Sequence, residues 1–272
     1  MPELPEVETT RRGVAPHVEG RRVTAVRVRD PRLRQPVPAD LAACLVGARL
    51  RTVHRRAKYL LFEFPAGTLI VHLGMSGSLR VLPPGTPPQL HDHVDLEFDG
   101  RYCVRLRDPR RFGLVLWTTA DPGTHPLLAH LGPEPWDPGF TADYLADLAA
   151  PRPGAVKNFL MDGEVVVGVG NIYASESLHR ARIHPSRPAR RVSRARYGDL
   201  VVAVRDVLDA AIRFGGTTLR DFTHDDGTPG YFRNELRVYD RAGEACLQCG
   251  EGRIRQRVIG QRMSYFCPRC QR

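Results

Sequence analysis

The sequence contains no apolar run long enough to cross a membrane, and its first residues do not resemble a secretory signal. A membrane-spanning helix needs about 18 or more consecutive apolar residues, and a signal peptide has an apolar core that this acidic N-terminus lacks. No internal repeat and no low-complexity tract is present either. We therefore expect a cytoplasmic protein with no membrane partner.

Lysine is scarce: Lys58 and Lys157 are the only two among 272 residues, so arginine provides nearly all of the 40 basic side chains. With 30 acidic side chains, the formal net charge is +10. The planar guanidinium group is well suited to phosphate, and a basic chain favours a polyanionic partner. A merely soluble basic surface is an equal alternative from charge alone, so the positions of the charges have to decide.

The six cysteines are better explained by metal binding or burial than by disulfides if the chain is cytoplasmic. Two C-x-x-C pairs with seventeen residues between them lie near the C-terminus, formed by Cys246, Cys249, Cys267 and Cys270. Four thiolates at this spacing predict a closed tetrahedral site for one structural Zn²⁺ ion, since a redox dithiol needs only one pair. The segment between the pairs predicts a basic hairpin. Cys44 and Cys103 are expected to be buried.

Hydrophobic periodicity divides the chain into a strand-rich part and a helical part. It predicts a helix from about Pro5 to His17, followed by short strands at 23–28, 49–54, 59–64, 68–73, 94–98, 102–106 and 114–117. Strands without helices between them indicate an antiparallel sandwich or barrel. Helical spacing follows at 141–148, 172–182 and 193–214, where Ser193 can cap the last helix and Gly215-Gly216 can end it. The expected domains are 1–130, a linker at 131–139, 140–237 and 238–272.

A glycine-rich turn at Gly168-Val169-Gly170-Asn171 opens one of these helices. It resembles part of a dinucleotide-binding fingerprint, but the last glycine and the strand–helix–strand unit are missing. A nucleotide-dependent oxidoreductase is therefore disfavoured, and no nucleotide cofactor is expected. The backbone N–H groups at such a turn can bind a phosphate, and Asn171 would add a side-chain donor.

The first residues, Pro2 and Glu3, can carry covalent chemistry. Removal of Met1 would expose the secondary amine of Pro2, which can attack an electrophilic carbon and form an iminium, while Glu3 transfers protons. The alternative, favoured on these residues alone, is that Pro5 begins a helix whose dipole is complemented by the acidic side chains Glu3, Glu6 and Glu8.

Taken together, these motifs resemble the formamidopyrimidine-DNA glycosylase family. The resemblance runs in order through segments 2–8, 55–60, 72–77 and 108–113, the Asn171 turn and the two cysteine pairs. The related endonuclease VIII branch shares this plan, but Leu4 and the run 6–8 are more similar to the formamidopyrimidine branch. The resemblance implies an α+β multidomain fold: an N-terminal antiparallel β-sandwich with an N-terminal helix, and a C-terminal helix-two-turn-helix domain with a zinc-bound β-hairpin.

The resemblance also implies an activity. The family excises oxidised purines, 8-oxoguanine and formamidopyrimidines, from double-stranded DNA and then cleaves the strand at the abasic site. By resemblance Pro2 is the nucleophile, Glu3 protonates the deoxyribose, and Lys58 assists β-elimination. Arg262 would assist δ-elimination or hold a phosphate, and the phosphate role is favoured because arginine stays charged.

Access to the sugar requires the damaged base to leave the duplex. By resemblance the void is filled by Met75, Arg110 and Phe112, through apolar wedging of a kind that kinks DNA; core packing of Met75 and Phe112 is the alternative. The implied DNA contacts are Lys58, His72, His91, Arg110, Lys157, Asn171, Tyr239 and Arg262. A metal site at His91-Asp92-His93 is disfavoured.

A lesion-capping loop is implied by the segment from Gly215-Gly216 onward, with Thr217, Thr218, Arg220 and Tyr231 as candidate residues. Its two glycines suit a mobile lid, although an ordinary helix-to-hairpin connection is the alternative. The main rival for the whole chain is a non-catalytic, zinc-dependent DNA-binding protein, which would have no need of the Pro2 amine. No heptad or self-complementary apolar face appears, so a monomer is expected.

Overall fold

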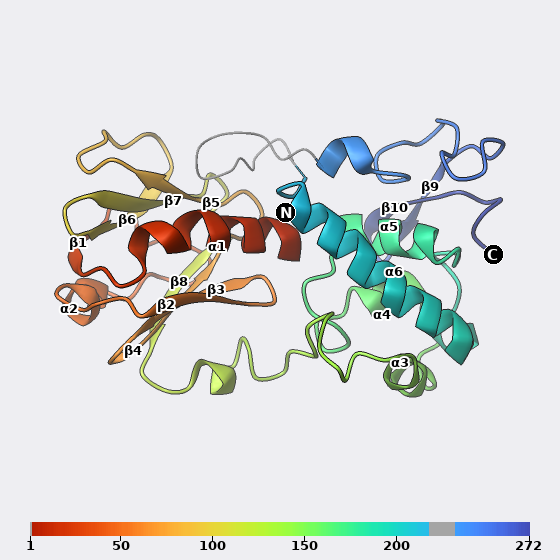
Figure 1. Ribbon diagram of the computed structural model, residues 1–272, viewed down its shortest axis with the longest axis horizontal. Helices are drawn as coiled ribbons and strands as arrows, with labels where there is room; N and C mark the ends of the chain where they lie inside the picture. The colour runs from red at the N-terminus through yellow and green to blue at the C-terminus, as the bar shows by residue number, and fades with distance from the viewer. Residues whose placement is uncertain (1, 218–231) are drawn as a thin grey trace. The chain divides into compact units, whose positions relative to one another are not determined.

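The computed structural model describes residues 2–217 and 232–272 (Figure 1). The candidate loop residues Thr218, Arg220 and Tyr231 lie outside the described residues. The chain divides into two compact units. The first unit consists of the chain up to Ala129 and a second segment that begins at Phe214. The second unit consists of His130–Arg213 and Phe232–Arg272.

The first unit contains two four-stranded antiparallel sheets and the helix α1 (Leu4–Val18). One sheet has the order β1 (Val23–Val28), β6 (Asp92–Phe98), β7 (Tyr102–Arg107), β5 (Ser78–Leu82). The other has the order β2 (Thr52–Arg56), β3 (Tyr59–Phe64), β4 (Gly67–His72), β8 (Leu114–Thr118). Side chains of both sheets and of α1 share one buried core, so the predicted antiparallel sandwich is confirmed.

Strict alternation explains why β3 was predictable. In β3 every second side chain, Leu60, Phe62 and Phe64, is buried, whereas its neighbours are half-exposed. A slip of one residue would turn this apolar set toward water, so the burial pattern specifies the register of β3 against β4. Strand β5 and the five-residue helix α2 (Leu41–Leu45) were not predicted from the sequence, because segments this short give almost no periodic signal.

Helix α1 begins with a reciprocal capping box. The backbone N–H of Glu3 donates to Oε2 of Glu6 at 2.8 Å, and the side chain of Glu3 accepts from the backbone of Glu6 in return. These bonds satisfy donors that the first helical turn leaves without intrahelical partners. The apolar face of α1, including Val7, Val14 and Val18, packs into the sandwich core. The N-terminal residues are therefore held by a rigid element.

The second unit is helical, with a small hairpin near the C-terminus. Its helices are α3 (Ala142–Ala149), α4 (Val156–Leu160), α5 (Asn171–Arg180) and α6 (Arg194–Arg213), and its strands are β9 (Arg255–Ile259) and β10 (Arg262–Phe266). Single turns of 3-10 helix lie at Ala189–Arg191 and Phe232–Glu235, and the first unit has another at Pro122–Thr124. The predicted helical domain and basic hairpin are confirmed, whereas the five-residue α4 was missed.

Two details of the second unit refine the prediction. Residues 131–139, expected to form a linker, are bound to α6, since Arg205 Nε donates to the carbonyl of Pro135 at 2.7 Å and Trp136 Nε1 donates to Asp209 at 3.0 Å. In the hairpin, Gly260 and Gln261 both have positive φ, of 55° and 60°, as the tight two-residue turn between paired strands requires. In the part of the chain that the structure describes, no helix has the length and apolar character needed to span a bilayer.

Candidate active site and metal centre

The N-terminal residues are fixed by a buried carboxylate. Pro2 and Glu3 lie directly before α1, and both are buried. Glu6 is fully buried, and its Oε2 accepts from the backbone N–H of Glu3 at 2.8 Å. Its Oε1 accepts two bonds from Thr217, one from the backbone N–H at 2.8 Å and one from the hydroxyl at 3.0 Å. One side chain therefore holds both the predicted catalytic residue Glu3 and Thr217, the one loop candidate that the structure describes.

A chain of polar contacts connects α1 to the turn that carries Lys58. Glu8 binds Arg55 Nε at 3.3 Å, and Arg55 Nη1 donates to the carbonyl of Ala57 at 3.0 Å. Burial acts to raise the pKa of Glu8, but bonds and charges from Arg11, Arg12 and Arg55 lower it overall. Ala57 has a left-handed φ of 54° in the two-residue turn between β2 and β3. The strained turn presents Lys58 beside the first strand residue, Tyr59.

His72 lies next to this turn and is held as a neutral ring. It pairs with Tyr59 across β3 and β4, with ring centroids 4.8 Å apart. Its Nδ1 accepts from the backbone N–H of Gly74 at 2.9 Å, which leaves the ring proton on Nε2. Burial, followed by the charges of Lys58 and Arg34, lowers the pKa of His72 to about 4.

The three candidate void-filling residues lie on two turns that touch each other. Met75 is 38% exposed and Phe112 is 43% exposed, so core packing, the alternative for both, is wrong. The guanidinium of Arg110 lies 5.1 Å from the centroid of the Phe112 ring. Gly74 has a φ of 64°, and a Cβ there would come within 2.5 Å of the Phe112 backbone. Only glycine allows the turns to approach this closely.

Asp108 organises this pair of turns, although no local pattern in the sequence predicts this role. Its fully buried carboxylate accepts from the Ser76 hydroxyl at 2.8 Å, from Gly113 N at 2.7 Å and from Arg110 N at 3.3 Å. Ser76 follows Met75, and Gly113 follows Phe112. The carboxylate therefore joins the turn of Met75 to the turn of Arg110 and Phe112.

The two histidines of the His91-Asp92-His93 segment lie near each other, with ring centroids 6.4 Å apart, and both bond to the backbone of Asp108. His93 is buried, and its Nε2 donates to the carbonyl of Asp108 at 2.9 Å. His91 is half-buried with a φ of 74°, and its own carbonyl accepts from Asp108 N at 3.0 Å. Among the described residues the cysteine cluster is the one group of three or more ligand side chains arranged to hold a metal.

In the second unit, Lys157 and Asn171 tie helix α5 to the hairpin. Lys157 is fully buried, and its Nζ donates to Asn171 Oδ1 and, at 2.6 Å, to Ser264 Oγ. Asn171 Nδ2 donates to the carbonyl of Met263 at 3.0 Å. A direct phosphate contact by Lys157, as predicted, does not fit this burial, because its ammonium is enclosed by protein acceptors. Its geometry is that of a positioning residue for Asn171 and β10.

Tyr239 is positioned by a second buried carboxylate that the sequence analysis also missed. Glu176 on α5 accepts from the backbone N–H groups of Arg237, Val238 and Tyr239 at 2.9, 3.0 and 2.8 Å. Burial raises the pKa of Glu176, against the effect of these three donors. The Tyr239 ring packs edge-on against Tyr265 of β10. The approach to the hairpin is thus anchored to the same helix as Asn171.

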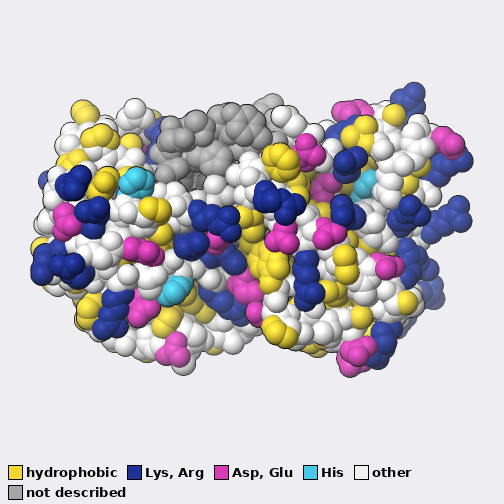
Figure 2. All heavy atoms as spheres, viewed as in Figure 1, with side chains coloured by type: hydrophobic (Ala, Val, Ile, Leu, Met, Phe, Trp, Pro, Cys, Tyr) yellow, Lys and Arg dark blue, Asp and Glu magenta, His cyan; other side chains and the backbone are white. Residues whose placement is uncertain are grey.

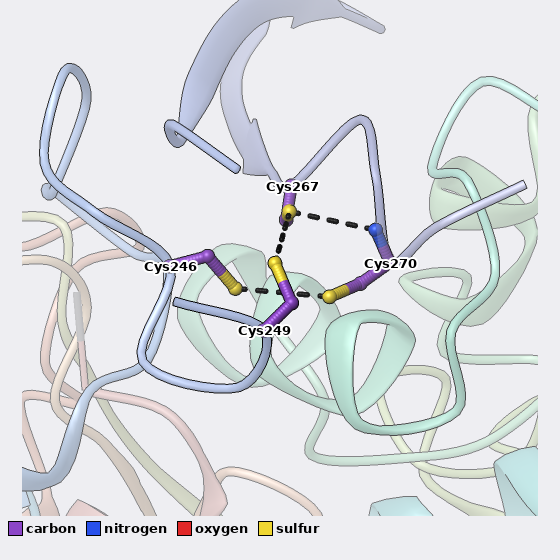
Figure 3. Close-up of side chains that lie close together, drawn as sticks. All are labelled: Cys246, Cys249, Cys267 and Cys270. Carbon is purple, nitrogen blue, oxygen red and sulfur yellow. Dashed lines mark hydrogen bonds between the residues drawn. The ribbon is translucent and has the colours of Figure 1, made fainter. Parts of the chain in front are cut away.

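The four predicted metal ligands converge (Figure 3). Their sulfur atoms all lie within 4.8 Å of one another, with 3.7 Å between Cys246 and Cys270 and 3.8 Å between Cys249 and Cys267. Backbone N–H groups of Gly252 and Glu251 lower the pKa of the Cys249 thiol to about 6, while burial raises that of Cys267 and Cys270. The cluster can hold a metal ion. It clamps the hairpin whose first β10 residue, Arg262, is exposed.

Of the other two cysteines, Cys103 is buried and Cys44 is half-buried on α2. The predicted burial is confirmed fully for Cys103 and partly for Cys44. The candidate residues otherwise form two groups. The first unit brings together Lys58, His72, Met75, Arg110 and Phe112, and the second unit brings together Lys157 and Asn171 beside the clamped hairpin.

Comparison with known proteins decides the family. Residues 1–115 match the sequence model of the formamidopyrimidine-DNA glycosylase N-terminal domain, and residues 131–223 match that of the formamidopyrimidine-DNA glycosylase H2TH domain. The chain belongs to the formamidopyrimidine-DNA glycosylase family. The family predicted from the sequence, and with it the prediction of an enzyme, is confirmed.

Individual relatives match over the full length. The formamidopyrimidine-DNA glycosylase of Methylococcus capsulatus is 62% identical over 100% of both chains. Two solved structures of the family are also similar over 100% of both chains. One is a complex between a Lactococcus lactis FPG mutant and a Fapy-dG containing DNA, with 30% identity and a TM-score of 0.92. The other is MutM in complex with carbocyclic 8-oxo-G containing DNA, with 31% identity and a TM-score of 0.90.

Replacing Asp108 by asparagine tests its role in joining the two turns. The new Nδ2 group, which carries two N–H donors, would face N–H or O–H donors that the carboxylate accepts, so we expect a loss of about 1–3 kcal/mol in the free energy of unfolding. Urea denaturation of Asp108→Asn measures this loss. Asp121→Asn is the matched control, because Asp121 makes a similar bond to Gly123 N in an exposed turn. Equal stability of the two variants would contradict the role of Asp108.

His72 predicts a pH dependence of stability. Since its pKa is lowered to about 4 in the folded chain, its contribution is complete above the ordinary pKa of about 6.5 and is lost as the pH falls toward 4. The loss has a maximum slope of about 1.4 kcal/mol per pH unit. Unfolding free energies of the wild type and His72→Gln should therefore converge below pH 6.5. The exposed His54, replaced in the same way, is the matched control for exchanging a histidine in the same unit.

Proposed function

We propose that this chain is a DNA glycosylase that removes oxidised purines, 8-oxoguanine and formamidopyrimidines, from double-stranded DNA and cleaves the strand at the resulting abasic site. The observation that carries the proposal is the N-terminal arrangement, in which Pro2 directly precedes a capped helix and the buried Glu3 is bonded to Glu6. Two solved relatives bind DNA that contains Fapy-dG or carbocyclic 8-oxo-G. The proposal includes, from the sequence, a monomer in the cytoplasm.

The proposed reaction is covalent catalysis by an amine. After removal of Met1, the nitrogen of Pro2 attacks C1′ of the damaged nucleotide, a C–N bond forms, the bond to the base breaks, and the proton lost from the nitrogen neutralises the departing base. Glu3 gives a proton to the ring oxygen as the sugar opens, and the nitrogen and C1′ then share an iminium. The iminium acidifies the neighbouring C2′ proton, so that β-elimination and then δ-elimination release the two phosphates. Lys58 assists the first elimination.

The exposed turns of the first unit suit the step that opens the duplex. Base extrusion costs a few kcal/mol, and Met75 with Phe112 would occupy the emptied space while Arg110 bonds the unpaired opposite base. Wedging by apolar side chains favours a kinked duplex. Asp108 holds both turns in one geometry before DNA arrives, which lowers the entropy cost of binding.

The remaining candidates would hold the phosphate backbone. The Nε2–H of His72 is a suitable donor to a phosphate oxygen. The Nδ2 of Asn171 carries two N–H groups; one is bonded to the carbonyl of Met263, and the other can donate to a phosphate. His91, Tyr239 and Arg262 are further proposed contacts, and Lys157 acts by positioning Asn171. Lesion binding by Thr217, Thr218, Arg220 and Tyr231 stays a prediction.

The cysteine cluster fits a zinc ion. A tetrahedron with Zn–S bonds of about 2.3 Å has sulfur atoms close to the spacings of 3.7 and 3.8 Å found here. All four positions are taken by thiols, so the ion would be structural. Bound by Cys246, Cys249, Cys267 and Cys270, it would fix the hairpin that presents Arg262 and take no part in the reaction.

Blocking the N-terminus tests the nucleophile. The chain is prepared with a short cleavable extension before Pro2, and the same preparation after cleavage to Pro2 is the matched control. Borohydride trapping on a duplex with one 8-oxoguanine opposite cytosine should give a cross-link, mapped to Pro2, only after cleavage. Duplex binding should be equal before and after. Trapping by the extended chain would refute Pro2 as nucleophile, and binding without trapping in both forms would favour the non-catalytic DNA-binding protein.

Replacing one cysteine tests the metal. Cys249→Ser should contain less than one zinc per chain by mass spectrometry and should lose affinity for duplex DNA, because metal binding and folding of the hairpin are coupled. Cys44→Ser, outside the cluster, is the control and should keep both. Full zinc content in Cys249→Ser would contradict the four-cysteine site.

A further inference from the structure

Helix α5 contributes a histidine to the back of the cysteine cluster. His179 is 2% exposed and Cys246 is fully buried, and His179 Nε2 lies 3.5 Å from Cys246 Sγ. A metal-bound thiolate has no proton, so in that state the sulfur accepts and the ring nitrogen donates. His179 is therefore placed to donate a hydrogen bond that stabilises the negative charge of the Cys246 thiolate.

The same helix ends at an arginine with an unusual backbone. Arg182 has a φ of 58°, and the bonds from Arg182 N to His179 O and from Ile183 N to Leu178 O close the helix end. Glycine is the usual residue at this left-handed position, because other residues are strained there. The side chain of Arg182 makes no hydrogen bond or ion pair with any residue that the structure describes. The fold alone gives no reason for an arginine here.

Arg182 lines a pocket of about 420 Å³ that also contains two of the cluster cysteines. The pocket is lined by Arg182, Arg196, Gln248, Cys249, Arg269, Cys270 and Arg272. Cys249 and Cys270 are the two half-buried members of the cluster. Figure 2 shows Lys and Arg side chains gathered toward the C-terminal end of the second unit.

The arginine side chains that line this pocket differ in their bonding partners. Arg196 is bound to the backbone carbonyls of Ala181 and Arg182, and Arg269 pairs with Glu251. Four thiolates around a divalent cation carry a formal charge of two minus. Arg182 adds an unneutralised positive charge on the side where that negative charge meets solvent.

We propose that helix α5 is the electrostatic support of the metal centre. His179 donates from Nε2 to the Cys246 thiolate on the buried side, and Arg182 offsets the cluster's negative charge on the half-buried side. Both are positioning residues that slow the loss of the metal. The inference rests on the proposed zinc site.

Metal release measures the contribution of His179. Zinc is transferred from the intact protein to excess chromogenic chelator, and we expect His179→Phe to release it about tenfold faster, since loss of such outer bonds weakens metal sites about 10–100-fold. His179→Gln keeps an N–H donor and should be closer to the wild type. With cobalt in place of zinc, the sulfur-to-metal charge-transfer band of His179→Phe should move to longer wavelength, because an unbonded thiolate gives up electrons more easily. Unchanged release and an unchanged band would overturn the role of His179.

Arg182→Gly separates strain from charge. The variant relieves the left-handed backbone, so its melting temperature should be equal to or above that of the wild type. Zinc release should nevertheless be about two- to fivefold faster, as expected for the loss of one exposed charge. Arg111→Gly is the matched control, because Arg111 also has a φ of 58° but lies in the first unit. Equal release rates in the two variants would overturn the role of Arg182.

The zinc content of the wild type distinguishes two kinds of failure. If the purified chain holds no zinc, the proposed metal site fails and this inference fails with it. If the chain holds one zinc ion but both α5 variants release it at the wild-type rate, the metal site stands and the support by α5 is wrong.

Discussion

The buried carboxylate of Glu6 is the interaction on which the proposed active site depends. It binds Glu3, and it also binds Thr217, which lies 211 positions further along the chain than Glu6 itself. A carboxylate without water around it is stable only when donors fill its lone pairs. The start of α1 and the chain at Thr217 therefore cannot shift separately without leaving a buried charge unsatisfied. This constraint fixes the position of the residues that the proposed chemistry needs.

The same device occurs at two other places. Asp108 joins the turns of Met75 and Phe112, and Glu176 gathers three consecutive backbone N–H groups ahead of the hairpin. Each carboxylate orders a segment that has no ladder of backbone hydrogen bonds of its own. In a chain whose surface is rich in arginine, irregular segments with candidate functional residues are thus organised from inside by acids.

The sequence predicted those parts of the molecule that repeat or that carry unusual chemistry. Alternating burial made β3 recognisable, and the two cysteine pairs predicted the cluster. The short elements β5, α2 and α4 were missed because five residues give too little periodicity. Burial of Lys157 was missed for a different reason: it depends on Asn171 and Ser264, and contacts between such distant residues leave no local pattern. The roles of Asp108 and Glu176 were missed likewise, since an acid that binds distant backbone looks in sequence like any other acid.

The scarcity of lysine has a practical consequence. Of the two lysines, Lys157 is fully buried with its Nζ bonded to Asn171 and Ser264, so it is closed to reagents that acylate amines. Lys58 and the N-terminus are the remaining primary or secondary amines of the chain, and both belong to the first unit. Amine-directed dyes, cross-linkers and coupling resins, which label most proteins at many places, would here attach beside the proposed catalytic residues. For this protein, a routine labelling reaction becomes a probe of the site, and an immobilisation through amines becomes a way to block it.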